Sequence, residues 1–173
     1  MRLMFLFAVS ILFVSCGPTI YVDFEKNQDF SEFTTYQFYP DIDSGLNEFD
    51  DKRVIATIDS ILQQRGFTKT DSNRFYINFY VSESLGNSRN TIGIGVGGGG
   101  GNVGVGVSGG IPIGGKVIRQ QLTIDFVDAQ KDQSLVWQAV VEGELKEKAS
   151  PQQKERYYYS VVEKALRKFP PKK

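Results

Sequence analysis

The sequence predicts an α+β fold in which a mainly antiparallel sheet carries two helices packed on one face. Several short segments alternate apolar and polar residues, as half-buried strands do. Two longer segments repeat apolar residues at helical spacing. The last two predicted strands follow one another directly, as in an antiparallel hairpin. The predicted element order is therefore β-β-α-β-(Gly-rich loop or hairpin)-β-β-α.

The first half of the chain supplies three strands and one helix. Residues 20–24 alternate in the manner of a strand, and residues 34–39 are rich in β-branched and aromatic side chains. The period then changes to that of a helix over 47–65, with Gly66 suited to the position after its end. The strand at 74–83 alternates most regularly. Its predicted core face consists of Phe75, Ile77, Phe79 and Val81.

The second half begins with a predicted hairpin of strands 116–128 and 135–145, joined by the polar residues 129–133. One strand presents Ile118, Leu122, Ile124 and Phe126 to the core, with Gln120 as a polar exception. The other presents Leu135, Trp137, Ala139 and Val141. Matching these faces makes opposed residue numbers add to 261 or 263. Arg119 would then face Glu142 or Glu144 across the strands.

The last predicted helix has a well-defined start. Ser150 can cap it, Pro151 suits the first helical position, and Gln153 can complete a capping box. Pro170 and Pro171 are expected to stop it. Its predicted buried stripe consists of Tyr158, Val161 or Val162, Ala165 and Phe169.

Composition excludes several classes of function. The chain of 173 residues has 20 Lys and Arg against 20 Asp and Glu, which argues against nucleic acid as a partner. It has no His and one Cys, which excludes a His-based catalytic triad, a soft-ligand zinc site and an internal disulfide. We expect no metal and no cofactor. A P-loop-like spacing ends at Lys116, but Val117 replaces the Ser or Thr that would hold Mg²⁺.

The N-terminus predicts a lipoprotein signal peptide over residues 1–15. The uncharged segment 3–14 follows Arg2 and is too short to cross a bilayer as a helix. Ser15-Cys16 resembles the lipobox of bacterial lipoproteins, although Phe13 stands where Leu is usual. The resemblance implies that Cys16 becomes the first mature residue and carries acyl chains such as palmitate. The alternative is a structural Cys behind an ordinary signal peptide.

The predicted location follows from that anchor. Two or more acyl chains bind a membrane stably without a spanning helix, since each buried CH₂ contributes about 0.8 kcal/mol. In this lipoprotein class, acidic residues after the Cys can direct export to the cell surface, and residues 17–19 contain none. We therefore expect a bacterial envelope protein in the inner leaflet of the outer membrane, facing the periplasm.

Residues 16–173 are predicted to form one domain with a Gly-rich insertion at 86–115. That insertion holds 14 of the 18 glycines. Residues 92–96 and 103–107 alternate Gly with Ile or Val, which indicates a loop or a marginal hairpin. A second hypothesis makes this uncharged segment a surface for the membrane or for self-association.

Several weak motifs follow one another in a fixed order along the chain, at 21–24, 29–31, 34–36, 62–67, 75–81, 124–128, 135–137 and 169–171. In this order they resemble a bacterial lipoprotein family, the domain of unknown function numbered 4136. They cover nearly the whole mature chain, with Glu25 departing from the Asp that commonly closes the first strand. The resemblance implies an envelope lipoprotein with no established reaction and no catalytic residues.

The predicted function is a non-enzymatic binding or assembly role, with an envelope protein or polymer as the partner. It depends on the anchor and on the lack of a recognisable catalytic set. The alternative is an enzyme that acts on an envelope polymer through Asp125, Glu142 and Glu144, which are expected on the polar face of the sheet.

Overall fold

The structure is a computed structural model that describes residues 19–87, 91–93, 110–112 and 115–171. The elements of its first half are β1 (Thr19–Phe24), the 3-10 helix η2 (Phe30–Glu32), β2 (Thr35–Phe38), α2 (Glu48–Gln64), β3 (Thr68–Lys69) and β4 (Phe75–Asn87). Those of its second half are β5 (Thr91–Gly93), β6 (Gly110–Pro112), β7 (Lys116–Asp128), β8 (Leu135–Lys146) and α3 (Pro151–Leu166).

The main sheet has six strands in the order β1-β8-β7-β4-β2-β3 and is mixed. The pairs β1–β8, β8–β7 and β7–β4 are antiparallel, but β2 runs parallel to both β3 and β4. The prediction of a mainly antiparallel sheet was therefore wrong at this edge. The reason is the crossover: α2 separates β2 from β3 and β4, and a helical crossover returns the chain in the same direction. The short β3 was not predicted.

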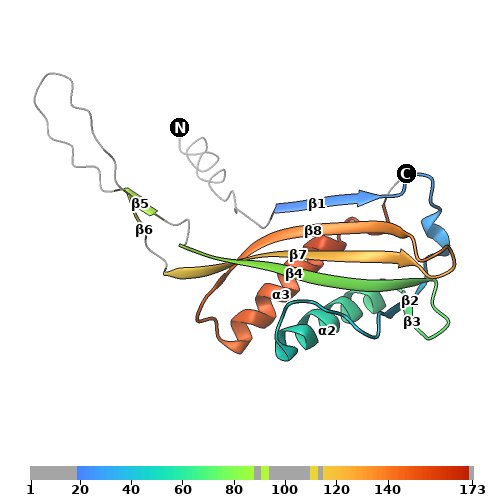
Figure 1. Cartoon of the computed structure of the whole chain (residues 1–173), viewed down its shortest axis with the longest axis horizontal. Helices are drawn as coiled ribbons and strands as arrows, with labels where there is room; N and C mark the ends of the chain where they lie inside the picture. Colours follow the sequence, from blue (N-terminus) through green and yellow to red (C-terminus); the bar gives the residue numbers. More distant parts are fainter. Residues whose placement is uncertain (1–18, 88–90, 94–109, 113–114, 172–173) are drawn as a thin grey trace, which may run out of the picture.

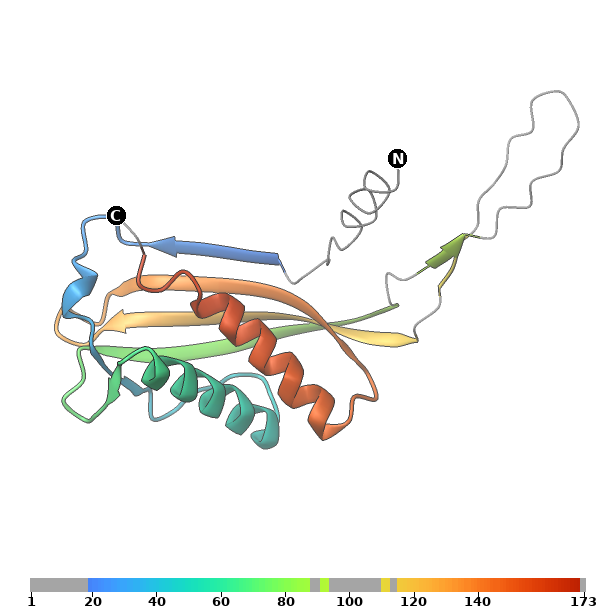
Figure 2. The ribbon, with the colours of Figure 1, turned by 180° about the vertical axis from the view of Figure 1, so that it is seen from behind.

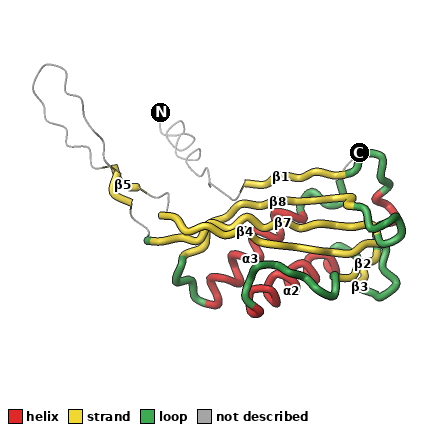
Figure 3. Tube along the Cα trace, viewed as in Figure 1, coloured by secondary structure: helices red, strands yellow, loops and turns green. Residues whose placement is uncertain are grey.

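Both helices pack on one face of the sheet, as the α+β prediction requires. Figures 1 and 2 show α2 and α3 side by side below the sheet, and Figure 3 shows the strands as a single layer. The opposite face carries no helix in the described part of the chain. The largest fully buried side chains lie between the layers: Trp137, Tyr36, Tyr158, Phe33, Phe75, Phe79, Phe126, Ile58, Leu62, Ile77, Ile124 and Leu166.

The ends of both helices confirm their local sequence signals. Asn47 caps α2 by accepting from the backbone N–H groups of Phe49 and Asp50, and Gly66 follows the helix at a φ of 88°. Ser150 and Gln153 form the predicted capping box of α3. However, α3 ends at Leu166, before the prolines. The buried Phe169 therefore belongs to the segment that follows the helix.

The β7–β8 register confirms one of the two predicted alignments. Arg119 pairs with Glu144 and Phe126 pairs with Trp137, so that opposed numbers add to 263. The register then shifts between Phe126 and Val127, where Leu135 becomes the partner of Val127. Because this irregularity re-aims the start of β8, Leu135 is 51% exposed, and its predicted place on the core face was wrong.

The described parts of the Gly-rich insertion form a short antiparallel pair, β5 with β6. Thr91 pairs with Pro112, and these residue numbers add to 203, as do those of every β4–β7 pair. The β4–β7 pair and the β5–β6 pair thus have the same register. This agrees with a hairpin at the base of the insertion. The predictions for 94–109 lie outside the described residues.

Candidate functional site

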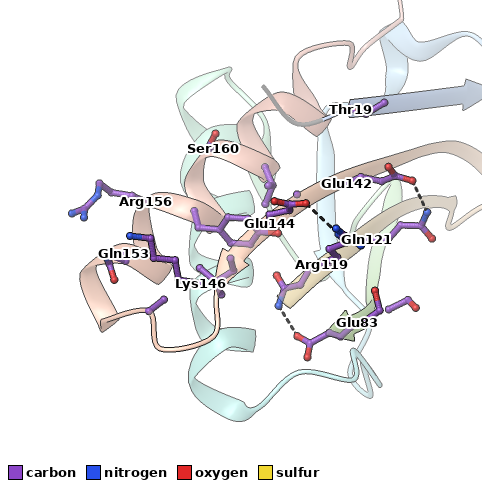
Figure 4. A pocket seen from close by; sticks show the side chains of 18 residues that line it. Thr19, Glu83, Arg119, Gln121, Glu142, Glu144, Lys146, Gln153, Arg156 and Ser160 are labelled. Atoms are coloured by element: carbon purple, nitrogen blue, oxygen red, sulfur yellow. Dashed lines mark hydrogen bonds and ion pairs between the residues drawn. The ribbon is translucent and has the colours of Figure 1, made fainter. Parts of the chain in front are cut away.

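A groove lies at the end of the sheet where β8 runs past the start of β1. Thr19, the first residue of β1, pairs with Glu142, so β8 continues for four further residues, to Lys146. The groove encloses about 850 Å³ between this end of the sheet and α3. Figure 4 shows side chains from β4, β7, β8 and α3 around it.

Polar cross-strand pairs line the sheet side of the groove. Arg119 Nε donates to Glu144 Oε1 at 3.2 Å, and Gln121 Nε2 donates to Glu142 Oε1 at 3.4 Å (Figure 4). These pairs join β7 to β8. They give the groove both signs of charge on neighbouring strands, which suits a partner that carries both donors and acceptors.

Gln120 of β7 lines the groove on the side that faces α3, and it is 4% exposed. Its amide donates to Glu83 at 2.5 Å and to the hydroxyl of Tyr158 at 3.2 Å. Gln120 was the polar exception in an otherwise apolar strand face. It is buried there because the two neighbours satisfy its amide, so it couples β4, β7 and α3.

Tyr157 of α3 closes the groove over the backbone of Gly143. A Cβ built on Gly143 would lie 2.7 Å from Tyr157 Oη and 2.9 Å from Cε2, closer than real contacts allow. Burial raises the pKa of Tyr157, and the neighbouring Tyr158 and the negative charges of Glu83 and Glu144 raise it further. The ring is therefore held as a neutral phenol against a strand that must lack a side chain at this position.

Replacing Gly143 with alanine should destabilise the protein by about 1–3 kcal/mol, because the added methyl group collides with the Tyr157 ring. The cost should disappear in a Tyr157→Ala background, where alanine also suits a strand better than glycine does. Urea denaturation of the four proteins of this cycle measures the coupling. An equal cost of Gly143→Ala in both backgrounds would show that the ring is not the cause.

The structure brings two of the three predicted carboxylates together. Glu142 and Glu144 both line the groove, whereas Asp125 pairs with Gln138 further along the strands, outside it. Burial raises the pKa of Asp125, and the 2.8 Å hydrogen bond from Gln138 opposes that shift. Asp125 thus belongs to a different environment from the two glutamates. Cys16 lies outside the described residues.

Sequence reasoning missed Gly143 and Tyr157 as groove residues. One signal was present: an isolated glycine inside a strand pattern often marks a close approach of another group. Tyr157 carried no such signal, because only the packing of α3 across β8 places it there.

A second groove, of about 670 Å³, lies beside β2 and the start of α2. Tyr39 and Tyr76 stack there with ring centroids 4.9 Å apart, and Gln37 donates to Asp71 at 3.0 Å.

Among the described residues, no group of three or more acidic or Cys side chains is placed to hold a metal ion. The described helices also include none with the length and apolar character needed to cross a bilayer.

The fold and grooves define an α+β protein built on a six-stranded mixed sheet with two helices on one face. The chain belongs to the DUF4136 family, a domain of unknown function, whose model matches residues 20–171. This confirms the resemblance seen in the sequence motifs. No curated protein is significantly similar to the chain.

Solved structures share the fold at low sequence identity. A PDZ domain protein from Parabacteroides distasonis is similar with a TM-score of 0.54 and 15% identity over 91% of this chain. This chain spans only 37% of that protein's chain. The PelC dodecamer from Paraburkholderia phytofirmans gives a TM-score of 0.50 and 11% identity, covering 86% of this chain and 96% of that one. At these identities the likeness shows the fold alone.

Proposed function

We propose that this protein is a lipoprotein of the bacterial cell envelope, anchored through acyl chains on Cys16 and facing the periplasm. Its proposed role is non-enzymatic: it binds or assembles an envelope partner next to the membrane. The single observation that carries the proposal is the short distance in sequence between Cys16 and the folded domain.

The tether between the acylated residue and the sheet would be very short. Strand β1 begins at Thr19, three residues after Cys16, and three residues span at most about 10 Å. Thr19 also lines the groove. An anchor at Cys16 would therefore hold the groove beside the bilayer and limit how far the domain can move from it.

The chemistry of the groove supports recognition more than proton transfer. Its acidic side chains Glu83, Glu142 and Glu144 hydrogen-bond to Gln120, Gln121 and Arg119, so their charges are already engaged within the sheet. The carboxyl group that burial pushes toward its neutral form, Asp125, lies elsewhere. Polar pairs of this kind favour orientation and selectivity at a binding surface.

Cys16→Ser should move the protein from the membrane fraction to the soluble fraction and abolish its labelling with radioactive palmitate. The reason is that the acyl chains supply the membrane affinity in this account. Cell fractionation and labelling measure both effects, with Ser15→Ala as a control that keeps the thiol. A Cys16→Ser protein that stays in the membrane and is still labelled would contradict the anchor.

The binding role is tested separately by photo-crosslinking in intact cells. A crosslinking amino acid at Ser160, which lines the groove, should capture a discrete envelope partner. The matched control is Tyr159, which is 53% exposed on the same helix but is not a groove residue. Equal capture from the two positions, or none from Ser160, would contradict a partner in the groove.

A further inference from the structure

The two edges of the main sheet differ in how well they are protected against pairing with another strand. One edge is β3, which has two residues, one of them Lys69. The other edge is β1, with six residues that include no Lys, Arg or Pro and no bulge. In the described part of the chain, no strand pairs with the outer side of β1 (Figure 1). Natural edge strands of this length and composition are templates for strand addition.

The hydrogen bonding of β1 shows which of its backbone groups face outward. The N–H of Glu25 donates to Val136 O at 2.9 Å, so Glu25 faces β8. Backbone hydrogen-bonding groups alternate in direction along a strand. The backbone groups of Thr19, Tyr21 and Asp23 therefore also point toward β8. Those of Ile20, Val22 and Phe24 point outward, away from the sheet. The N–H of Phe24 is already engaged by the carboxylate of Asp23 at 2.9 Å. Among the residues that the structure describes, the outward N–H and C=O groups of Ile20 and Val22 have no backbone partner, so both can pair with a new strand.

The side chains of β1 are complementary to a second copy of the same strand. In an antiparallel pair centred on Tyr21, Ile20 lies opposite Val22 of the other copy, and both are the outward-facing residues that exchange hydrogen bonds. Tyr21 lies opposite Tyr21 of the other copy. The Tyr21 side chain is 59% exposed and lies on the sheet face that carries no helix. Asp23 lies opposite Thr19, so no like charges meet.

We propose that β1 pairs antiparallel with β1 of a second copy of this chain in that register, which joins the two sheets into one of twelve strands. The shifted register, centred on Val22, is worse because Ile20 would face Phe24, whose N–H is engaged. The contact is isologous, as in most homodimers.

The proposed lipid anchor would strengthen this pairing but is not required for it. The two Thr19 residues would lie about 14 Å apart along the pair, from four residues at about 3.4 Å each. Two short tethers at that spacing can reach one bilayer. Confinement to a membrane also raises the effective concentration of one copy for the other.

The test is disulfide trapping of the full-length protein in its native membranes with single added cysteines. In the proposed register the two Tyr21 Cα atoms form a non-hydrogen-bonded pair about 4.5 Å apart, within the range that a disulfide bridges. After mild oxidation, Tyr21→Cys should give at least about tenfold more dimer than Thr19→Cys, whose two copies lie too far apart. Co-expressed Thr19→Cys and Asp23→Cys should crosslink to each other.

Three controls keep the outcome interpretable. The unsubstituted chain measures any contribution of Cys16, and Tyr80→Cys measures random collision from a 44% exposed site on the same face. Tyr21→Lys, which places like charges opposite each other, should shift the detergent-solubilised protein from dimer to monomer mass. Dimer from Tyr21→Cys no greater than from Tyr80→Cys, a monomeric native chain, or a crosslink to a protein of different mass would each overturn the proposal. The mass of the detergent-solubilised chain separates this proposal from that of the anchor, because it reports pairing whether or not Cys16 is acylated.

Discussion

Phe169→Ala is expected to lower the free energy of unfolding by roughly 3–5 kcal/mol, one of the two largest effects in the molecule. The ring is 3% exposed and meets five other aromatic rings. Their centroids lie 4.6 Å away for Phe126, 5.3 Å for Trp137, 5.5 Å for Phe67, 5.8 Å for Phe75 and 5.9 Å for Phe30. Its loss leaves a cavity that rings from η2, β4, β7 and β8 cannot fill by small shifts.

Denaturation in guanidinium chloride measures this effect, and Phe49→Ala is the matched control. Phe49 is 70% exposed at the start of α2, so its truncation should change stability by less than about 0.5 kcal/mol. A similar small effect for Phe169→Ala would mean that the C-terminal segment does not close the core.

Asp128→Ala is expected to lower the free energy of unfolding by roughly 3–5 kcal/mol as well, because it removes the buried partner of Arg74. The carboxylate that remains near Arg74 is that of Glu32, which lies 3.9 Å away and is 70% exposed. Asp128 is fully buried at the end of β7 and accepts from Arg74 and from the backbone N–H of Gln130. The Arg74 side chain is only 14% exposed and lies over the ring of Phe33, 4.4 Å from its centroid. This ion pair therefore connects the hairpin to the start of β4 and to η2.

The same pair gives a pH dependence with a defined sign. Burial alone would raise the pKa of Asp128, but the hydrogen bonds from Arg74 and Gln130 outweigh it and hold the pKa below its usual range. A carboxyl with a lowered pKa stabilises the folded state above its unfolded pKa of about 3.9 and loses that contribution as the pH falls. The difference in the free energy of unfolding between the native chain and Asp128→Ala should therefore become smaller below about pH 4.

Glu48→Gln serves as the control for an exposed pair. Glu48 and Lys52 form a salt bridge on α2 with side chains 78% and 67% exposed. Its loss should leave the free energy of unfolding nearly unchanged, because solvent screens the interaction between two exposed side chains. If Asp128→Ala cost as little as this, the buried pair would not contribute as described.

Local rules predicted much of this fold. Ser150 and Gln153 defined the start of α3 through a few neighbouring groups, and period-two patterns placed Phe75, Ile77 and Phe79 on the core face. Matching two such faces reduced the β7–β8 register to two alignments, one of which the structure has. Each of these depends on residues close in sequence or on one strand pair.

Features set by distant contacts were not predictable. The parallel pairing of β2 with β4 depends on where α2 returns the chain, and the exposure of Leu135 depends on an irregularity in the β7–β8 ladder. The groove needed the crossing of α3 over Gly143. Glu142 and Glu144 were found from alternation on one strand, whereas the separate environment of Asp125 required the structure.

Mass spectrometry of the N-terminal peptide, taken from protein purified out of its native membranes, tests the central claim most directly. The account predicts a chain that begins at Cys16, with a diacylglyceryl group on sulfur and an acyl group on the amine. A peptide that still contains residues 1–15, or one whose Cys16 carries no lipid, would contradict it.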